Sequence, residues 1–156
     1  SINTKDKGAV ADYLVRLLEK NAFDRSGLIY GMGHAVYSKS DPRADLLSRC
    51  AADLAKEKGF EEDFKLYSTV AALAPEIIAS KRKMYKGVSP NVDFYSGLIY
   101  QMLELPLELF TPIFAIARVV GWSAHRIEEI QNAGKIIRPS YISVKPEREY
   151  VPISER

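Results

Sequence analysis

Apolar residues recur every three or four positions along most of this chain, and that spacing strongly restricts how it can fold. The clearest run comprises Val10, Tyr13, Leu14, Leu17 and Leu18, with charged residues on the opposite face. Such a run is typical of an amphipathic helix that buries one face against a core. Only residues 141–151 alternate in the manner of a strand, and they could form a tail or a short hairpin. The sequence therefore predicts an all-α fold.

Residues that start and stop helices divide the rest of the chain. One helix should begin with Asp41 as its N-cap and Pro42 at the first helical position, and it should end at Gly59. Its inward face includes Cys50, which we expect to be a core thiol. Three more helices are expected from about Glu61 with a bend at Pro75, from about Val92 to Leu103, and from about Thr111 to Ala133, where Gly121 could interrupt it.

Composition and charge argue against several classes of protein. The net charge of +2 over 156 residues is too small for the concentrated basic face of a nucleic-acid-binding protein. A single cysteine excludes an internal disulfide and a cysteine-rich zinc site. We expect no apolar run to reach the roughly 20 residues of a membrane span, and a cytoplasmic location is the default. The chain begins with Ser1 rather than Met, which favours a processed or engineered piece.

The motif GMGHAVY at residues 31–37, followed by DPR at 41–43, is the first candidate for function. Its glycines allow the backbone to approach a ligand closely, and they hold His34 on a turn. Arg43 lies in the first turn of a helix, where exposed backbone amides favour an anion. A histidine that can donate a hydrogen bond beside an arginine indicates an acidic small molecule. The alternative is a histidine satisfied by backbone carbonyls.

Four further motifs follow: PNVDFYSG at residues 90–97, FAIAR at 114–118, GWSAHRIE at 121–128 and IRPSY at 137–141. In this order and spacing, and together with the first motif, they resemble the carboxy-terminal part of the citrate synthase family. The resemblance implies a small, helical, coenzyme A-binding domain over residues 1–104. It further implies that residues 105–156 are the returning end of the large domain, with helices for packing and dimerisation and an irregular tail.

The resemblance implies two catalytic residues. His34 would hydrogen-bond the ketone oxygen of oxaloacetate, and Asp93 would be the base that takes a proton from the methyl group of a thioester. Such a weak carbon acid yields its proton only to a base held at short range while the forming enol is stabilised. From the sequence alone, Asp93 could equally cap the helix that follows it, and the two roles are compatible.

The resemblance also implies the substrate-binding residues. Arg43, Arg118 and Arg138 would hold the two carboxylates of oxaloacetate, and Phe114 would line the pocket. Arg118 has apolar neighbours, so we expect it to be buried and to need an anionic partner. Arg138 would reach the site of a neighbouring subunit, which implies a homodimer. The second histidine, His125, is expected to be structural. The coenzyme A contacts would come from the backbone of Tyr30, Gly31, Met32 and Gly33 and from Lys86.

The reaction implied is the condensation of acetyl-coenzyme A with oxaloacetate to citrate and coenzyme A, with no metal and no prosthetic group. The family uses two further histidines upstream of this region, and none precedes His34 here. We therefore expect the isolated chain to be inactive. A 2-methylcitrate synthase that uses propionyl-coenzyme A is the alternative within the family, since one methylene changes binding by only about 1–3 kcal/mol. The alternative outside it is a non-catalytic helical module that binds coenzyme A or a partner.

Overall fold

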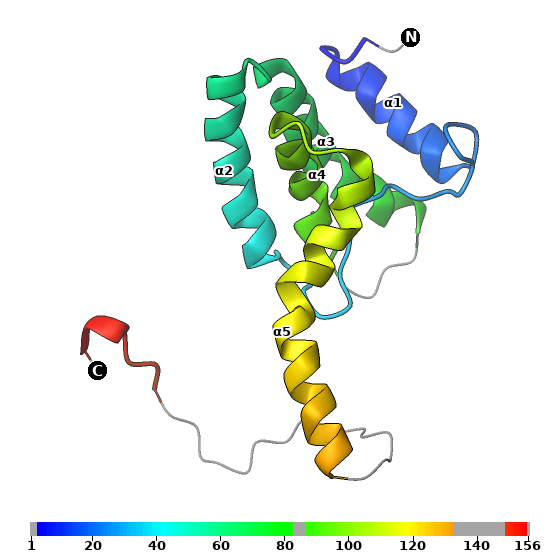
Figure 1. Ribbon diagram of the computed structural model, residues 1–156. Coiled ribbons are helices and arrows are strands. Elements are labelled where there is room, and N and C mark those ends of the chain that lie inside the picture. The colour runs from blue at the N-terminus through cyan, green and yellow to red at the C-terminus, as the bar shows by residue number, and fades with distance from the viewer. Residues whose placement is uncertain (1–2, 83–86, 133–148, 156) are drawn as a thin grey trace. The chain divides into compact units, whose positions relative to one another are not determined.

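The computed structural model describes residues 3–82, 87–132 and 149–155, and every element in these ranges is helical (Figure 1). The nearest approach to a sheet among them is an isolated antiparallel bridge between Met32 and Pro90. The prediction of an all-α fold is therefore confirmed. The helices are α1 (Lys7–Leu18), α2 (Pro42–Lys58), α3 (Glu61–Lys81), α4 (Val92–Met102) and α5 (Phe110–Gln131), with 3-10 turns η1 (Leu107–Leu109) and η2 (Ile153–Glu155).

The helix ends lie close to where the sequence predicted them. Asp41 caps α2 by accepting a hydrogen bond from the backbone N–H of Arg43, and Gly59 ends the helix in the left-handed conformation at φ 75°. The predicted interruption at Gly121 is wrong, because α5 runs through it unbroken. A glycine inside a helix destabilises it by only about 1 kcal/mol relative to alanine, which a long helix tolerates. Residues 149–151 form no strand, and residues 141–148 lie outside the described ranges.

The chain forms two compact units, Ser1–Phe114 and Ala115–Arg156, and the division falls inside α5. The boundary predicted from the sequence lies ten residues earlier, and the assignment of the two parts to a small and a large domain stays a prediction. Within the first unit, α4 packs on α2, α1 packs on α3, and α2 also touches α3 (Figure 1).

Two apolar clusters hold the first unit together. In one, small residues of α2 allow the large side chains of α4 to approach closely; in the other, α1 meets α3. Met32 packs against both clusters, so the glycine turn that carries it is anchored in the core. The buried residues of these clusters are Ala44, Ala51, Ala55, Phe94, Tyr95, Leu98 and Met102 in the first, and Val10, Leu14, Ala74 and Ile78 in the second.

The prediction that Cys50 is a core thiol is wrong, because its side chain is exposed. The buried face of α2 is centred on Ala44, Ala51 and Ala55. Successive residues of a helix are turned by about 100°, so Cys50 points away from the centre of that face. The buried face of α2 consists of alanines, and the larger side chains of the helix lie at the edge of this face.

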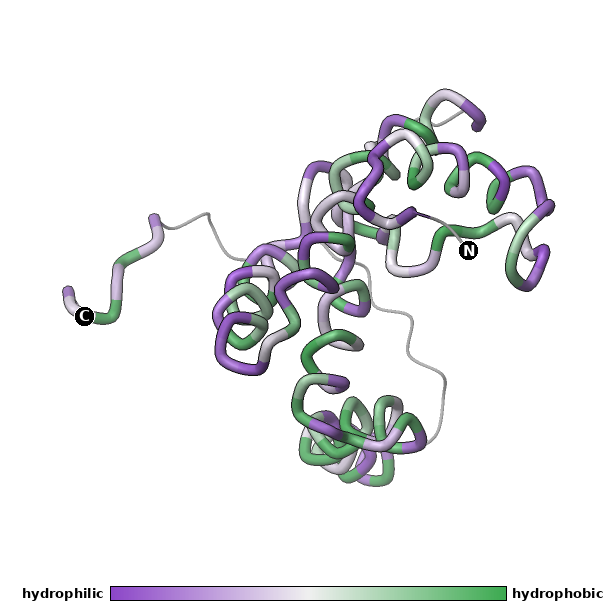
Figure 2. Tube along the Cα trace, turned by 90° about the horizontal axis from the view of Figure 1, so that it is seen from above, coloured by the Kyte–Doolittle hydropathy of each residue, from purple (hydrophilic) through white to green (hydrophobic). Residues whose placement is uncertain are grey.

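In the part of α5 that belongs to the second unit, every residue from Ile116 to Gln131 is exposed. Hydrophobic and hydrophilic residues are mixed along it (Figure 2). Arg118 is exposed as well, so the prediction of a buried guanidinium is wrong. The apolar neighbours that suggested burial are themselves open to solvent. The large exposed side chains of this stretch are Ile116, Val119, Val120, Trp122, Ile127 and Ile130.

The expectation that no apolar run reaches membrane-spanning length is also wrong. The segment Leu107–Gln131 is long and apolar enough to cross a bilayer, judged by length and composition alone. A single helix of this kind is weak evidence for a membrane protein, since the core helix of a soluble protein passes the same test.

Candidate functional site

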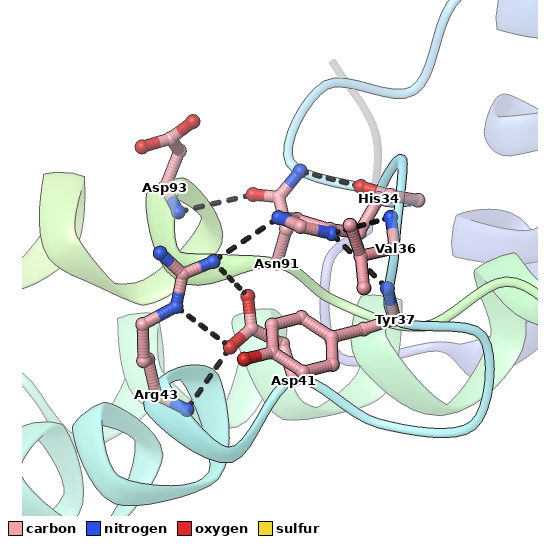
Figure 3. A network of polar contacts seen from close by, with 8 residues as sticks. His34, Val36, Tyr37, Asp41, Arg43, Asn91 and Asp93 are labelled. Carbon is pink, nitrogen blue, oxygen red and sulfur yellow. Dashed lines mark hydrogen bonds and ion pairs between the residues drawn. The ribbon is translucent and has the colours of Figure 1, made fainter. Parts of the chain in front are cut away.

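The turn that carries His34 is fastened to the segment just before α4 (Figure 3). The backbone N–H of Asn91 donates to the carbonyl of Gly31 at 2.8 Å, and the N–H of Gly33 donates to the carbonyl of Ser89 at 2.9 Å. The side-chain amide of Asn91 donates to the carbonyl of Gly33 at 2.9 Å. These bonds bring together the first and second sequence motifs, which are far apart along the chain.

The two glycines of the turn serve different purposes. Both have positive φ, 77° at Gly31 and 87° at Gly33, which L side chains rarely adopt. A Cβ on Gly31 would lie 2.9 Å from the Cα of Phe94, so this glycine lets the turn pack closely on α4. A Cβ on Gly33 would meet nothing within 4 Å. Of the two, therefore, Gly33 presents backbone to open space where a ligand could approach.

Backbone amides, rather than carbonyls, hold the imidazole of His34. Its Nδ1 accepts hydrogen bonds from the N–H of Val36 at 3.0 Å and from the N–H of Tyr37 at 3.1 Å. A nitrogen that accepts must carry the lone pair, so in the neutral ring the proton sits on Nε2. The turn thus presents His34 as a hydrogen-bond donor through Nε2, as its predicted role requires.

Asp41 holds Arg43 in a bidentate ion pair. The guanidinium donates from Nε to Oδ1 at 2.9 Å and from Nη2 to Oδ2 at 2.7 Å. The Asp41 side chain is fully buried, and the hydrogen bond from Arg43 lowers the pKa of this carboxyl to about 2 against the opposing effect of burial. The sequence predicted only a capping role for Asp41. An aspartate two residues before an arginine at the start of a helix is the sequence signal for this ion pair.

His34 and Arg43 face each other with two hydrogen-bond donors. Arg43 Nη2 lies 3.2 Å from His34 Nε2. Arginine only donates, and in the tautomer deduced above Nε2 donates too. An oxygen atom can accept from both N–H groups at once, and a carbonyl or carboxylate oxygen suits this place. The Tyr37 ring supports the arrangement, with its centroid 4.8 Å from that of His34 and 5.7 Å from Cζ of Arg43.

Asp93 is exposed in the first turn of α4. The capping role falls to Asn91, whose Oδ1 accepts from the N–H of Asp93 at 3.0 Å. The Asp93 carboxylate borders two hollows. One, of about 360 Å³, is also lined by Tyr30 and Gly31, and the other, of about 370 Å³, by Phe114. Asp93 therefore lies between the turn predicted to bind coenzyme A and the aromatic residue predicted to line the substrate pocket.

The structure brings together only some of the predicted residues. His34 and Arg43 are in contact, and Asp93 is linked to their turn through Asn91. Arg118 belongs to the second unit, as does His125, which lies exposed beside Glu128. Lys86 and Arg138 lie outside the described residues. Within the described ranges, no group of three or more histidine, cysteine, aspartate or glutamate side chains is placed to hold a metal ion.

Asp41→Ala should lower the free energy of unfolding by about 1–2 kcal/mol, because it removes an N-cap.

Asp41→Asn keeps the cap and removes only the charge. The lowered pKa means that ionised Asp41 stabilises the fold fully above the ordinary value of 3.8, and that this contribution is lost as the pH falls toward about 2. Urea unfolding of the wild type and Asp41→Asn should show a gap that closes over this range. Asp45→Asn, on the exposed face of the same turn, is the control, and a gap independent of pH would contradict the assignment.

Comparison with protein families matches residues 1–140 to the citrate synthase C-terminal domain. The chain is 43% identical to the citrate synthase of Synechocystis sp. over 129 residues, which cover 82% of this chain and 31% of that protein. It is 35% identical to 2-methylcitrate synthase 1 of Corynebacterium glutamicum, over 99% of this chain and 37% of that protein. The chain thus spans about a third of the length of the curated relatives it matches.

Solved structures give the same result. The citrate synthase of Thermoplasma acidophilum, in ternary complex with carboxymethyl coenzyme A and oxaloacetate, matches with a TM-score of 0.61 and 29% identity, over 99% of this chain and 43% of that one. The citrate synthase of Thermotoga maritima matches with a TM-score of 0.60 and 35% identity, over 97% of this chain and 38% of that one.

Proposed function

The chain belongs to the citrate synthase family, and from this premise we propose that it supplies part of a site that condenses acetyl-coenzyme A with oxaloacetate. The products are citrate and coenzyme A. The observation that carries the proposal is the meeting of two N–H donors, His34 Nε2 and Arg43 Nη2, on one turn that is hydrogen-bonded to the start of α4, where Asp93 lies.

The chemistry follows from these positions. Asp93 takes a proton from the methyl group of the thioester, and the resulting enol carbon attacks the ketone carbon of oxaloacetate. His34 donates its Nε2–H to the ketone oxygen, which becomes more negative as the carbon–carbon bond forms. Hydrolysis of the thioester then releases coenzyme A. Each of the two residues acts on one reactant, and Asn91 hydrogen-bonds to the backbone beside both.

Three arginines are proposed to hold the carboxylates of oxaloacetate. Asp41 occupies the Nε and Nη2 edge of Arg43, which leaves the Nη1 and Nη2 end for a carboxylate. Arg118 is proposed to contribute from α5. Arg138 is proposed to come from a second copy of the chain, which makes a homodimer part of the working site. Phe114, beside Asp93, is proposed to border the bound substrates.

The coenzyme A portion of the substrate is proposed to lie along the turn at residues 30–33. The Tyr30 hydroxyl donates to Asp24 at 2.5 Å, which fixes the ring at the edge of the hollow shared with Asp93 and lowers the pKa of Asp24. Gly33 offers open backbone beside it. Lys86 is proposed to meet the phosphates.

The proposed path predicts that Gly33→Val weakens the binding of coenzyme A to the 156-residue chain, because a branched side chain would fill the open space above the backbone. We expect a loss of affinity of at least about fivefold, or about 1 kcal/mol, by calorimetry. Gly59→Val is a matched control, because Gly59 also has a positive φ of 75° and open surroundings but lies at the far end of α2. Equal affinity in the two variants would contradict this path.

Activity is tested best in a complete protein. In a chimera, this chain would replace the matching third of the Synechocystis citrate synthase, to which it is 43% identical. We expect thiol release from acetyl-coenzyme A that depends on oxaloacetate. The 156-residue chain by itself should release none, since the two upstream histidines expected of the family are missing from it. A folded chimera without turnover, or turnover by the chain alone, would contradict the proposal. Binding of coenzyme A without turnover in the chimera would favour a non-catalytic module.

Condensation of propionyl-coenzyme A to 2-methylcitrate is the second candidate. It is favoured by the 35% identity to 2-methylcitrate synthase 1 of Corynebacterium glutamicum over almost the whole chain. The ratio of kcat/KM values for acetyl- and propionyl-coenzyme A in the chimera decides between the two, because specificity is the difference between these values.

We propose that protein, not lipid, covers the apolar face of α5. Arg118 lies near the middle of the segment Leu107–Gln131, and a charged residue at that depth of a bilayer destabilises insertion by about 2.5–3.5 kcal/mol or more.

A further inference from the structure

Asn91 joins the two motifs that carry the proposed catalytic residues by two hydrogen bonds to the glycine turn, and it makes a third to Asp93 within its own motif. Its backbone N–H donates to the carbonyl of Gly31 at 2.8 Å. Its side-chain Nδ2 donates to the carbonyl of Gly33 at 2.9 Å, and its Oδ1 accepts from the N–H of Asp93 at 3.0 Å (Figure 3). From the sequence alone, Asn91 is identified only as a member of the motif at residues 90–97.

The groups that the side chain holds are next to the reacting side chains. The carbonyl of Gly33 belongs to the peptide group that leads into His34. The N–H that Oδ1 accepts belongs to the peptide group that leads into Asp93. One planar amide therefore fixes the two peptide planes from which the proposed donor and the proposed base project. The Nδ2 and Oδ1 atoms of an amide are a fixed distance apart, so the amide restricts the spacing of the two backbone groups that it binds.

No other side chain of similar size offers both functions. The position needs an acceptor toward α4 and a donor toward the glycine turn, and an asparagine amide has one of each in a single plane. Aspartate would accept from α4 but place a carboxylate oxygen against the Gly33 carbonyl. Serine caps helices well but is too short to reach the turn at the same time. Alanine offers neither.

We infer that Asn91 is a positioning residue, which sets the separation and relative orientation of His34 and Asp93. This inference rests on the proposed function, since the two side chains must act on two reactants at a fixed distance. The contribution of Asn91 is to keep the turn and the first residues of α4 in one arrangement while the substrates enter and leave.

The test uses the 156-residue chain and the variant Asn91→Ser, which keeps a capping hydroxyl and a neutral side chain. We expect helix content and the urea midpoint to stay near those of the wild type. The backbone amides at positions 33 and 91 should exchange with solvent about tenfold faster, because the side chain no longer holds the turn. The ring ¹⁵N shifts of His34 should move from a single Nε2–H tautomer toward averaged values. Asn21→Ser, at an exposed loop position, is the control.

A role limited to capping would leave both the amide exchange and the His34 ring shifts unchanged in Asn91→Ser, and that result would overturn the inference. If Asn91→Ser does not fold, Asn91→Asp provides the same comparison with an equally good cap, and the same two readouts decide. Coenzyme A affinity, measured in parallel, separates the two proposals. A wild-type chain that binds no coenzyme A argues against the proposed function, whereas the exchange and ring-shift data still decide whether Asn91 fixes His34 relative to Asp93.

Discussion

Asp93→Asn is expected to lower kcat of the chimera by at least about a hundredfold, within the range of about 10² to 10⁴ that a general base contributes. Asparagine has the shape of aspartate but cannot take the methyl proton of the thioester. The stability of the fold should not change, because Asn91 and not Asp93 provides the helix cap. Thiol release with saturating acetyl-coenzyme A and oxaloacetate measures the loss.

Two comparisons make this result specific to the base. Asp53→Asn changes an exposed carboxylate on α2 that pairs with Lys56 at 3.8 Å, and it should leave kcat unchanged. Coenzyme A should bind the Asp93→Asn chimera as tightly as the parent, since the carboxylate acts on the methyl group. A variant that retains more than a tenth of the parent kcat would remove Asp93 from the role of base.

The helix ends could be predicted because their causes are local. A capping side chain at Asp41, the fixed φ of Pro42 and a left-handed Gly59 each act within a few residues of themselves. Burial is different, because it depends on what packs against a helix. Cys50 and Arg118 were both expected inside on the strength of their neighbours in sequence, and both are exposed.

The site shows the same division between local and distant causes. The motifs singled out His34, Arg43 and Asp93, and the structure places the first two in contact. The second role of Asp41, as the buried partner of Arg43, also has a local cause, because the two residues lie two positions apart at the start of one helix. The two bonds from Asn91 to the glycine turn depend on the turn and α4 lying side by side, which neither segment specifies on its own.

The exposed face of α5 leads to the last prediction, that the 156-residue chain self-associates. Ile116 and Val120 lie one turn apart and are 69% and 79% exposed. Burying each large apolar side chain contributes roughly 1.5–3 kcal/mol, so several of them favour association. A second copy of the chain is the partner we expect, since two-fold dimers are the commonest assemblies and bring identical faces together. Light scattering should therefore give a mass near twice the 17.5 kDa of one chain.

Val120→Lys should shift this dimer toward the monomer, because a buried, unpaired ammonium strongly disfavours the interface. His125→Lys is the matched control: it also places a lysine on α5, at a side chain that is 84% exposed and lies on a different face of the helix from Val120. Two results would refute the prediction. One is a wild-type mass of 17.5 kDa at every concentration, and the other is a Val120→Lys variant that keeps the dimer mass. Dissociation by Val120→Lys alone would identify this face of α5 as the contact between copies, because both variants add a lysine to the same helix and only one alters its apolar face.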